Sequence, residues 1–239
     1  MLNNMLTLVS DILFIRNTEE FLTLPAGAKF MKRIKFPWVM QPAVALFLVF
    51  FASTSWASAD RSPLEVIQSG TDRAIEILRS AQTGKAPTLY ERRAEILSIV
   101  DEYFNFDEMA MRALGRPWRE QSLSNREEFV RLFKRLLFNT YVDRVQTYTM
   151  GDEKVVYDSE EIRGRHALVR TRILNYRSTT VEVNYHLRLD DDGWRVFDVN
   201  VEGISLVNNF RSQFASILAN RTFEQLLHMM RERVERDTA

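Results

Sequence analysis

The sequence predicts an α+β domain: a curved antiparallel sheet of about four strands, covered on its apolar face by N- and C-terminal helices. Two observations predict this class. Apolar residues recur at helical spacing in residues 63–148 and again in 206–236. Between them, from residue 154 to 201, the spacing changes to the alternation of half-buried strands. Helices therefore flank one antiparallel meander.

The composition permits such a domain and excludes several functions. The chain has 239 residues, 46% of them hydrophobic, which is enough to bury a large core. Basic and acidic residues number 32 each, so no net charge attracts nucleic acid and we expect no nucleic-acid partner. The lack of cysteine excludes disulfides, thiol catalysis and thiolate metal sites. With only three histidines, we expect no metal site.

The N-terminal region has the three parts of a secretory signal. A basic run at 31–35 precedes the apolar residues 43–51, and Ala57-Ser58-Ala59 supplies the small residues that signal peptidase reads. We expect cleavage after Ala59, which makes 31–59 a signal peptide and 60–239 an exported domain. A membrane anchor is the alternative, although two prolines interrupt the region. Acidic residues in 1–30 fit no signal, so we interpret 1–30 as a mis-assigned extension upstream of a start at Met31.

The first helices have clear start and stop signals. Ser62 to Glu65 form a capping box with Pro63 at the first helical position, and the apolar stripe that follows ends near Gly84. A second helix is expected at 88–103. A short third helix is expected at 106–114, because Gly115 and a proline follow it.

The remaining helices and strands are predicted from capping residues and from the spacing of apolar residues. A capping box from Ser124 to Glu127 predicts a helix of about 20 residues, reaching Tyr148, with a wide aromatic face. Strands are expected at 154–158, 167–173, 181–189 and 194–201, with an Asp-Gly hairpin turn before the last. Ser205 then caps a helix at 206–218, and a final helix spans 222–236.

Motif searches find no catalytic centre. The chain lacks nucleophile-elbow, zinc-protease, P-loop and dinucleotide motifs. His166 and His186 are interpreted as ordinary strand histidines, and the acidic turn at 190–192 as solvated rather than calcium-binding. Arg170 and Arg172 leave two interpretations open: charge balance against nearby acids, or a surface that docks an acidic partner.

The apolar residues also leave two interpretations. Nine phenylalanines follow residue 59, and several share one side of the 124–148 helix. Periodicity does not separate a solidly packed core from the lining of an enclosed cavity. The pattern of residues alone leaves this choice open.

Two stretches resemble the signatures of a known family. The first is Phe104-Asn105-Phe106-Asp107-Glu108-Met109-Ala110, followed by Leu114-Gly115 and Trp118. The second is Trp194-Arg195-Val196-Phe197-Asp198-Val199, which leads into residues 202–207 and 209–214. Over about residues 63–234 the chain is similar to the periplasmic phospholipid-binding, toluene-tolerance-type proteins of the Mla lipid-asymmetry ABC transport pathway of Gram-negative bacteria. Phe210 stands where that family commonly has tyrosine.

The resemblance implies that the sheet and helices enclose a hydrophobic pocket, and that 60–239 is the lipid-binding domain of a periplasmic carrier without a catalytic residue or cofactor. Its cargo would be one phospholipid, moved between an outer-membrane lipoprotein complex and an inner-membrane ABC lipid transporter. We expect a monomer. Two acyl chains of roughly 15 methylenes each would cost on the order of 24 kcal/mol in water, so a carrier must hide them.

The expected lipid-binding residues come from the long helix, the sheet and the C-terminal helix. They are Phe133, Leu137, Tyr141, Val169, Val183, Tyr185, Leu187, Phe197, Leu206 and Phe210. Two other functions remain open: an isomerase- or dehydratase-like enzyme with its chemistry inside the pocket, and a periplasmic chaperone or adaptor.

Overall fold

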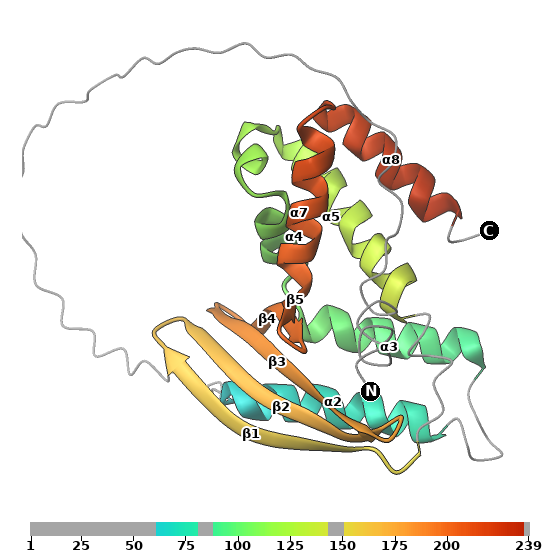
Figure 1. Cartoon of the computed structure of the whole chain (residues 1–239), viewed down its shortest axis with the longest axis vertical. Coiled ribbons are helices and arrows are strands. Elements are labelled where there is room, and N and C mark those ends of the chain that lie inside the picture. Colours follow the sequence, from blue (N-terminus) through green and yellow to red (C-terminus); the bar gives the residue numbers. More distant parts are fainter. Residues whose placement is uncertain (1–60, 81–87, 143–150, 237–239) are drawn as a thin grey trace, which may run out of the picture.

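The computed structural model describes residues 61–80, 88–142 and 151–236, in the order helices, sheet, helices (Figure 1). This confirms the α+β class. The expected signal peptide at 31–59 and the extension at 1–30 lie outside the described residues. No helix in the described ranges has both the length and the apolar character needed to cross a bilayer.

The first two helices, α2 (Pro63–Ser80) and α3 (Leu89–Tyr103), pack side by side. The expected capping box of α2 is confirmed, because the Glu65 N–H donates to Ser62 Oγ at 3.2 Å and the Ser62 N–H donates to Glu65 Oε2 at 2.8 Å. A Cβ at Gly70 would lie 3.2 Å from ring carbons of Tyr103. The missing side chain at Gly70 therefore lets the two helices approach closely.

The middle of the chain forms α4 (Phe106–Leu114), η1 (Arg116–Glu120), α5 (Leu123–Leu137) and the π-helical turn η2 (Phe138–Val142). The helix α5 begins earlier than predicted. Its cap is Ser122, whose Oγ accepts from the Asn125 N–H at 3.2 Å, so the predicted box at Ser124 is wrong. The predicted end at Tyr148 lies outside the described residues.

The sheet is an open antiparallel meander of five strands in the order β1-β2-β3-β4-β5. The strands are β1 (Lys154–Arg163), β2 (His166–Tyr176), β3 (Thr179–Asp190), β4 (Gly193–Val201) and the short β5 (Ile204–Ser205). The four expected strands are confirmed. An irregularity between Tyr157 and Ser159 interrupts the alternation in β1, which explains why the sequence predicted only its first half.

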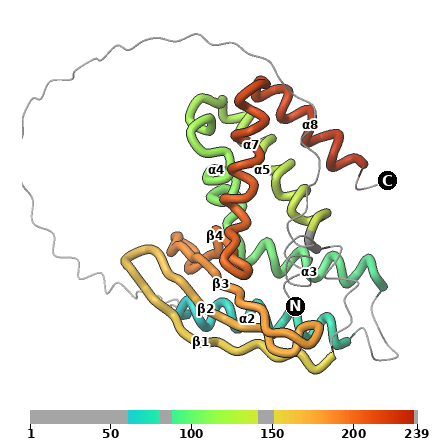
Figure 2. Tube along the Cα trace, in the orientation of Figure 1, coloured from blue at the N-terminus to red at the C-terminus, as the bar shows by residue number. Residues whose placement is uncertain are grey.

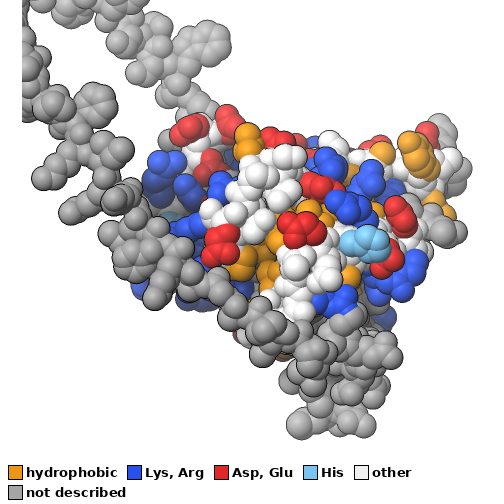
Figure 3. Space-filling model, turned by 90° about the horizontal axis from the view of Figure 1, so that it is seen from above, with side chains coloured by type: hydrophobic (Ala, Val, Ile, Leu, Met, Phe, Trp, Pro, Cys, Tyr) orange, Lys and Arg blue, Asp and Glu red, His pale blue; other side chains and the backbone are white. Residues whose placement is uncertain are grey.

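The C-terminal helices α7 (Leu206–Leu218) and α8 (Phe223–Arg236) join α4 and α5 in a bundle with its own aromatic core. Ser205 caps α7 as predicted, accepting from the Asn208 N–H at 3.0 Å. Figures 1 and 2 show this bundle standing at the β4 side of the sheet, whereas α2 runs along the strands. On the face seen in Figure 3, acidic and basic side chains are interspersed.

Candidate functional site

The strand register arranges side chains in rows on the sheet face that α2 covers. One row consists of Tyr157, Thr171, Val183 and Val201. The next row on the same face consists of Val155, Ile173 and Val181. Both rows share a face because side chains two residues apart on a strand point the same way.

The first half of α2 closes one end of this face. The Leu64 N–H donates to Glu160 Oε2 at 2.9 Å, which fixes the start of α2 against the end of β1. Val66 and Ile67 of α2 lie in one buried cluster with the strand residues Ala167, Val169, Leu187 and Val196. Val169, Leu187 and Val196 are 0% exposed, so this end of the sheet is packed solid.

The other end of the face carries an apolar strip made only of strand residues. Val181 and Val183 are buried at its centre, and the hydrophobic residues packed around them are Ile173, Tyr176, Tyr185, Val199 and Val201. Among the described residues, no helix side chain belongs to this group. The described helices therefore contribute no side chain to the apolar strip.

The second half of α2 runs past the apolar strip. Glu160 and Tyr157 are about 10 Å apart along β1, which matches the roughly 10 Å from Leu64 to Thr71 along α2. Thr71 does lie beside Tyr157. A further four residues of helix, about 6 Å, bring Ile75 level with the row of Ile173 and Val181.

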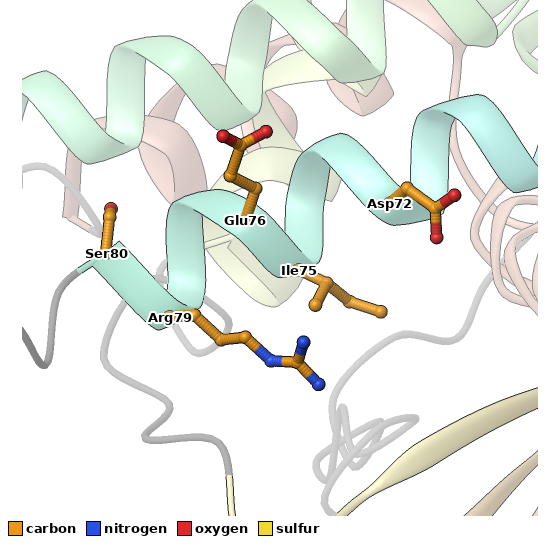
Figure 4. Close-up of a pocket in the computed structure, with 5 residues that line it drawn as sticks. All are labelled: Asp72, Ile75, Glu76, Arg79 and Ser80. Carbon is orange, nitrogen blue, oxygen red and sulfur yellow. The ribbon is translucent and has the colours of Figure 1, made fainter.

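A hollow of about 560 Å³ lies along this part of α2. Its described lining residues are Asp72, Ile75, Glu76, Arg79 and Ser80. In the close-up of Figure 4, Ile75 and Arg79 point away from α3, to the side where the strands pass. The volume is within the range of roughly 300–1,000 Å³ typical of small-molecule sites.

Two tyrosines mark the boundary between the packed end and the apolar strip. Burial raises the pKa of Tyr157, and the nearby carboxylate of Asp72 raises that pKa further. The Tyr157 hydroxyl has no well-aligned hydrogen-bond partner. Tyr185 keeps some exposed surface, yet loss of water around its hydroxyl raises its pKa to about 12. Both phenols therefore stay neutral at physiological pH in a poorly solvated environment.

Four of the expected lipid-binding residues lie on the sheet face that α2 covers. Val183 and Tyr185 belong to the apolar strip. Val169 and Leu187 lie under the first half of α2, in the packed end. The side chain of Tyr141 lies outside the described residues.

Four others lie in the core of the bundle. Phe133, Leu137 and Phe210 are buried there, and Leu206 packs at its edge. The rings of Phe133 and Phe210 meet edge to face with centroids 5.2 Å apart. The expected set is therefore divided, and the described structure does not bring these four helix residues against the apolar strip.

Phe197 lies on the opposite face of the sheet. Its ring centroid is 6.0 Å from that of His166 and 6.1 Å from that of His186, and the Arg112 guanidinium lies 4.0 Å from it. The cause is a register shift between His186 and Leu187 in the β3–β4 pairing, which sequence alternation does not reveal.

Sequence reasoning missed Ile75, Ile173 and Val181 as site residues. Ile75 belongs to the apolar stripe of α2, and the other two alternate correctly on their strands. Their relative positions depend on the register of β1, β2 and β3 and on where α2 begins against β1. The available signal was the alternation itself, which gives the face of a residue but not its neighbours.

The two signature stretches meet at a junction between the sheet and the bundle. The Asn105 N–H donates to the Val196 carbonyl at 2.8 Å. Glu108, only 6% exposed, accepts from Arg112 at 2.8 Å and from Arg188 at 2.7 Å. Asp198 caps α7, accepting from the Val207 N–H at 3.0 Å. These contacts join the sheet to the bundle, and none of the residues that make them lines the hollow.

The polar groups elsewhere indicate charge balance. Arg172 donates to both oxygens of Asp158 at 2.6 and 2.8 Å, and this contact holds the pKa of that carboxyl below its usual range. Arg170 pairs with Glu161 at 3.5 Å. The charge-balance interpretation of the arginine-rich strand accounts for both contacts. In the described ranges, no group of three or more His, Cys, Asp or Glu side chains could hold a metal ion.

A second hollow, of about 480 Å³, lies beside this junction and is polar. Its lining includes Asn105, Lys134, Arg195 and the aspartates at 101, 107, 190 and 192. Lys134 pairs with Asp101, and Arg195 lies 4.0 Å from Asp192. Charged walls of this kind do not suit acyl chains.

Comparisons with known proteins agree with the architecture. The model of the family described as MlaC protein matches residues 68–232. The chain is 20% identical over 190 residues to the intermembrane phospholipid transport system binding protein MlaC of Haemophilus influenzae, covering 77% of this chain and 88% of that protein. A phospholipid-binding protein from Ralstonia solanacearum, solved in complex with a phospholipid, has the same fold. The two structures superpose with a TM-score of 0.64 and are 19% identical in sequence, and the match covers 73% of this chain and 97% of the Ralstonia protein.

Proposed function

Because this chain belongs to the MlaC protein family, whose model matches well over half of it, we propose that it is a phospholipid-binding carrier of an intermembrane transport system. Its relative in Haemophilus influenzae is named as the binding protein of such a system. Two observations in this chain carry the proposal: an apolar strip to which the described helices add no side chain, and a hollow of about 560 Å³ along α2. We propose that the acyl chains lie against this strip.

The physical need for such a site is large. Two acyl chains of about 15 methylenes each lose on the order of 24 kcal/mol when they enter water, so a lipid does not cross an aqueous space unaided. A carrier offers the tails an apolar surface similar to the bilayer they leave. Net transfer is therefore close to balanced, and the carrier itself needs no catalytic residue.

The destination and the compartment belong to the same proposal. The signal peptide expected at 31–59 and the family membership support a periplasmic location. The partners we propose are an outer-membrane lipoprotein complex and an inner-membrane ABC lipid transporter, which this chain would visit as a monomer. The alternative of a pocket enzyme finds no support in the family match.

Native mass spectrometry of the full chain, purified from cells without added lipid, tests the proposal. We expect a population heavier than the polypeptide by one phospholipid, and lipid extraction should identify that mass. Polypeptide mass alone, in protein with the helical and sheet content described above, would overturn the proposal. A small polar adduct in its place would favour the enzyme.

A further inference from the structure

Arg79 is a cation at the hollow with no partner among the described residues. It lies in the last turn of α2, is exposed, and makes no ion pair or side-chain hydrogen bond within the described residues. Arg73 on the same helix is different, because it pairs with Glu102 at 2.5 Å and lies 5.6 Å from the ring of Tyr103. The guanidinium of Arg79 is therefore free to bind an anion.

The position of Arg79 follows from that of Ile75. The two residues are one helical turn apart, and Figure 4 shows both side chains pointing into the same space beside α2. By the rises of helix and strand, Ile75 falls level with the row of Ile173 and Val181, and the guanidinium of Arg79 falls about 6 Å further along the helix. An arginine can cover apolar chains with its methylenes while its charged end stays in water.

We propose that Arg79 binds the phosphate of the lipid whose tails lie on the apolar strip. This inference rests on the proposed function. A guanidinium matches a phosphate through two parallel hydrogen bonds. Because every phospholipid contains that phosphate, the contact selects phospholipids against uncharged lipids with the same tails and distinguishes little among head groups.

The contact is local and does not come from a general positive field. The charged lining residues are Asp72, Glu76 and Arg79, and two acids with one base leave the hollow with one net negative charge. Glu76 is three residues from Arg79 on the helix, yet the two make no ion pair. In Figure 4 the Glu76 side chain points to the α3 side of the helix, away from Arg79.

Arg79 could instead serve only to stabilise α2, since a cation in the last turn interacts favourably with the helix dipole. The two roles predict different results. A helix-stabilising arginine affects thermal unfolding alone, whereas a phosphate-binding arginine changes which lipids the protein takes up.

The test uses delipidated full-length protein and vesicles containing equal amounts of palmitoyl-oleoyl phosphatidylglycerol and palmitoyl-oleoyl glycerol. The protein is repurified and the two lipids are counted by mass spectrometry. We expect the wild type to be enriched in the phospholipid and Arg79→Gln to lower the ratio about tenfold, with uptake of the diacylglycerol unchanged. Arg131→Gln is the matched control, because Arg131 is exposed on α5, away from the hollow.

An unchanged ratio in Arg79→Gln overturns the inference, whether or not the variant unfolds at a lower temperature. An equal fall in Arg131→Gln overturns it too, because the effect would then be one of total charge. A wild type that takes up neither lipid would refute the proposed function itself. Uptake with an unaltered ratio leaves the proposed function standing and removes only the role of Arg79.

Discussion

Replacing Ile75 with tryptophan tests the position of the acyl chains. Ile75 is half-buried on the wall of the hollow, and the rises of helix and strand place it level with the paired residues Ile173 and Val181. An indole at this position would occupy space that the tails need. The fold should survive, because the residue projects into a hollow and not into the packed end of the sheet.

The magnitude follows from the methylenes that are displaced. If the indole excludes about three methylenes from the apolar strip, the lipid loses roughly 2.4 kcal/mol of burial, which weakens retention about 50-fold. Co-purified phospholipid per protein should then fall steeply. Overpacking of the surrounding side chains should cost about 1–3 kcal/mol of stability at most.

The assay is phosphate analysis of extracted lipid, together with thermal unfolding. Ile162→Trp is the matched control, since Ile162 is 51% exposed near the end of β1, far along the strand from the hollow. The control should keep its lipid. Full lipid content in Ile75→Trp with an unaltered unfolding temperature would show that the tails lie elsewhere.

Four further predictions concern other parts of the molecule. Phe133→Leu should cost roughly 1–2 kcal/mol in urea unfolding and leave bound lipid unchanged; a parallel loss of lipid would make Phe133 a lipid contact. Glu108→Gln should cost roughly 2–3 kcal/mol, because two arginines lose a charged acceptor; a neutral result would contradict the junction. Asp198→Ala should cost about 1 kcal/mol through the lost cap of α7, and unaltered stability would refute that. The pKa of Tyr185 is raised to about 12, so its contribution to stability is complete below pH 10 and is lost as the pH rises towards 12. Urea unfolding across that pH range should show a larger loss of stability in the wild type than in Tyr185→Phe, where the raised pKa of Tyr157 still contributes, and an equal loss in both proteins would contradict the prediction.

Local signals predicted most of the elements. The sequence shows some features directly because they involve residues close together in the chain. Examples are the capping box at Ser62, the cap at Ser205 and the alternation of buried residues from Val181 to Leu189. The error at the start of α5 is of the same local kind. Ser122 and Ser124 can both cap a helix, and only the structure shows that Ser122 does.

The site could be predicted only in part because it depends on long-range register. Alternation identified Val183 and Tyr185 on the inner face of β3, and both belong to the apolar strip. It did not show that the packed end includes Val169, because that depends on where α2 begins against Glu160. The aromatic face of α5 suggested a cavity wall, but its phenylalanines pack against the rings of α7 and α8.

Nuclear Overhauser effects between lipid and protein test the central claim most directly. The protein would be labelled at isoleucine, leucine and valine methyl groups and loaded with phospholipid. We expect cross-peaks from acyl methylenes to the methyl groups of Ile75, Val181 and Val183. Cross-peaks confined to bundle residues such as Leu226 and Leu227 would contradict the account.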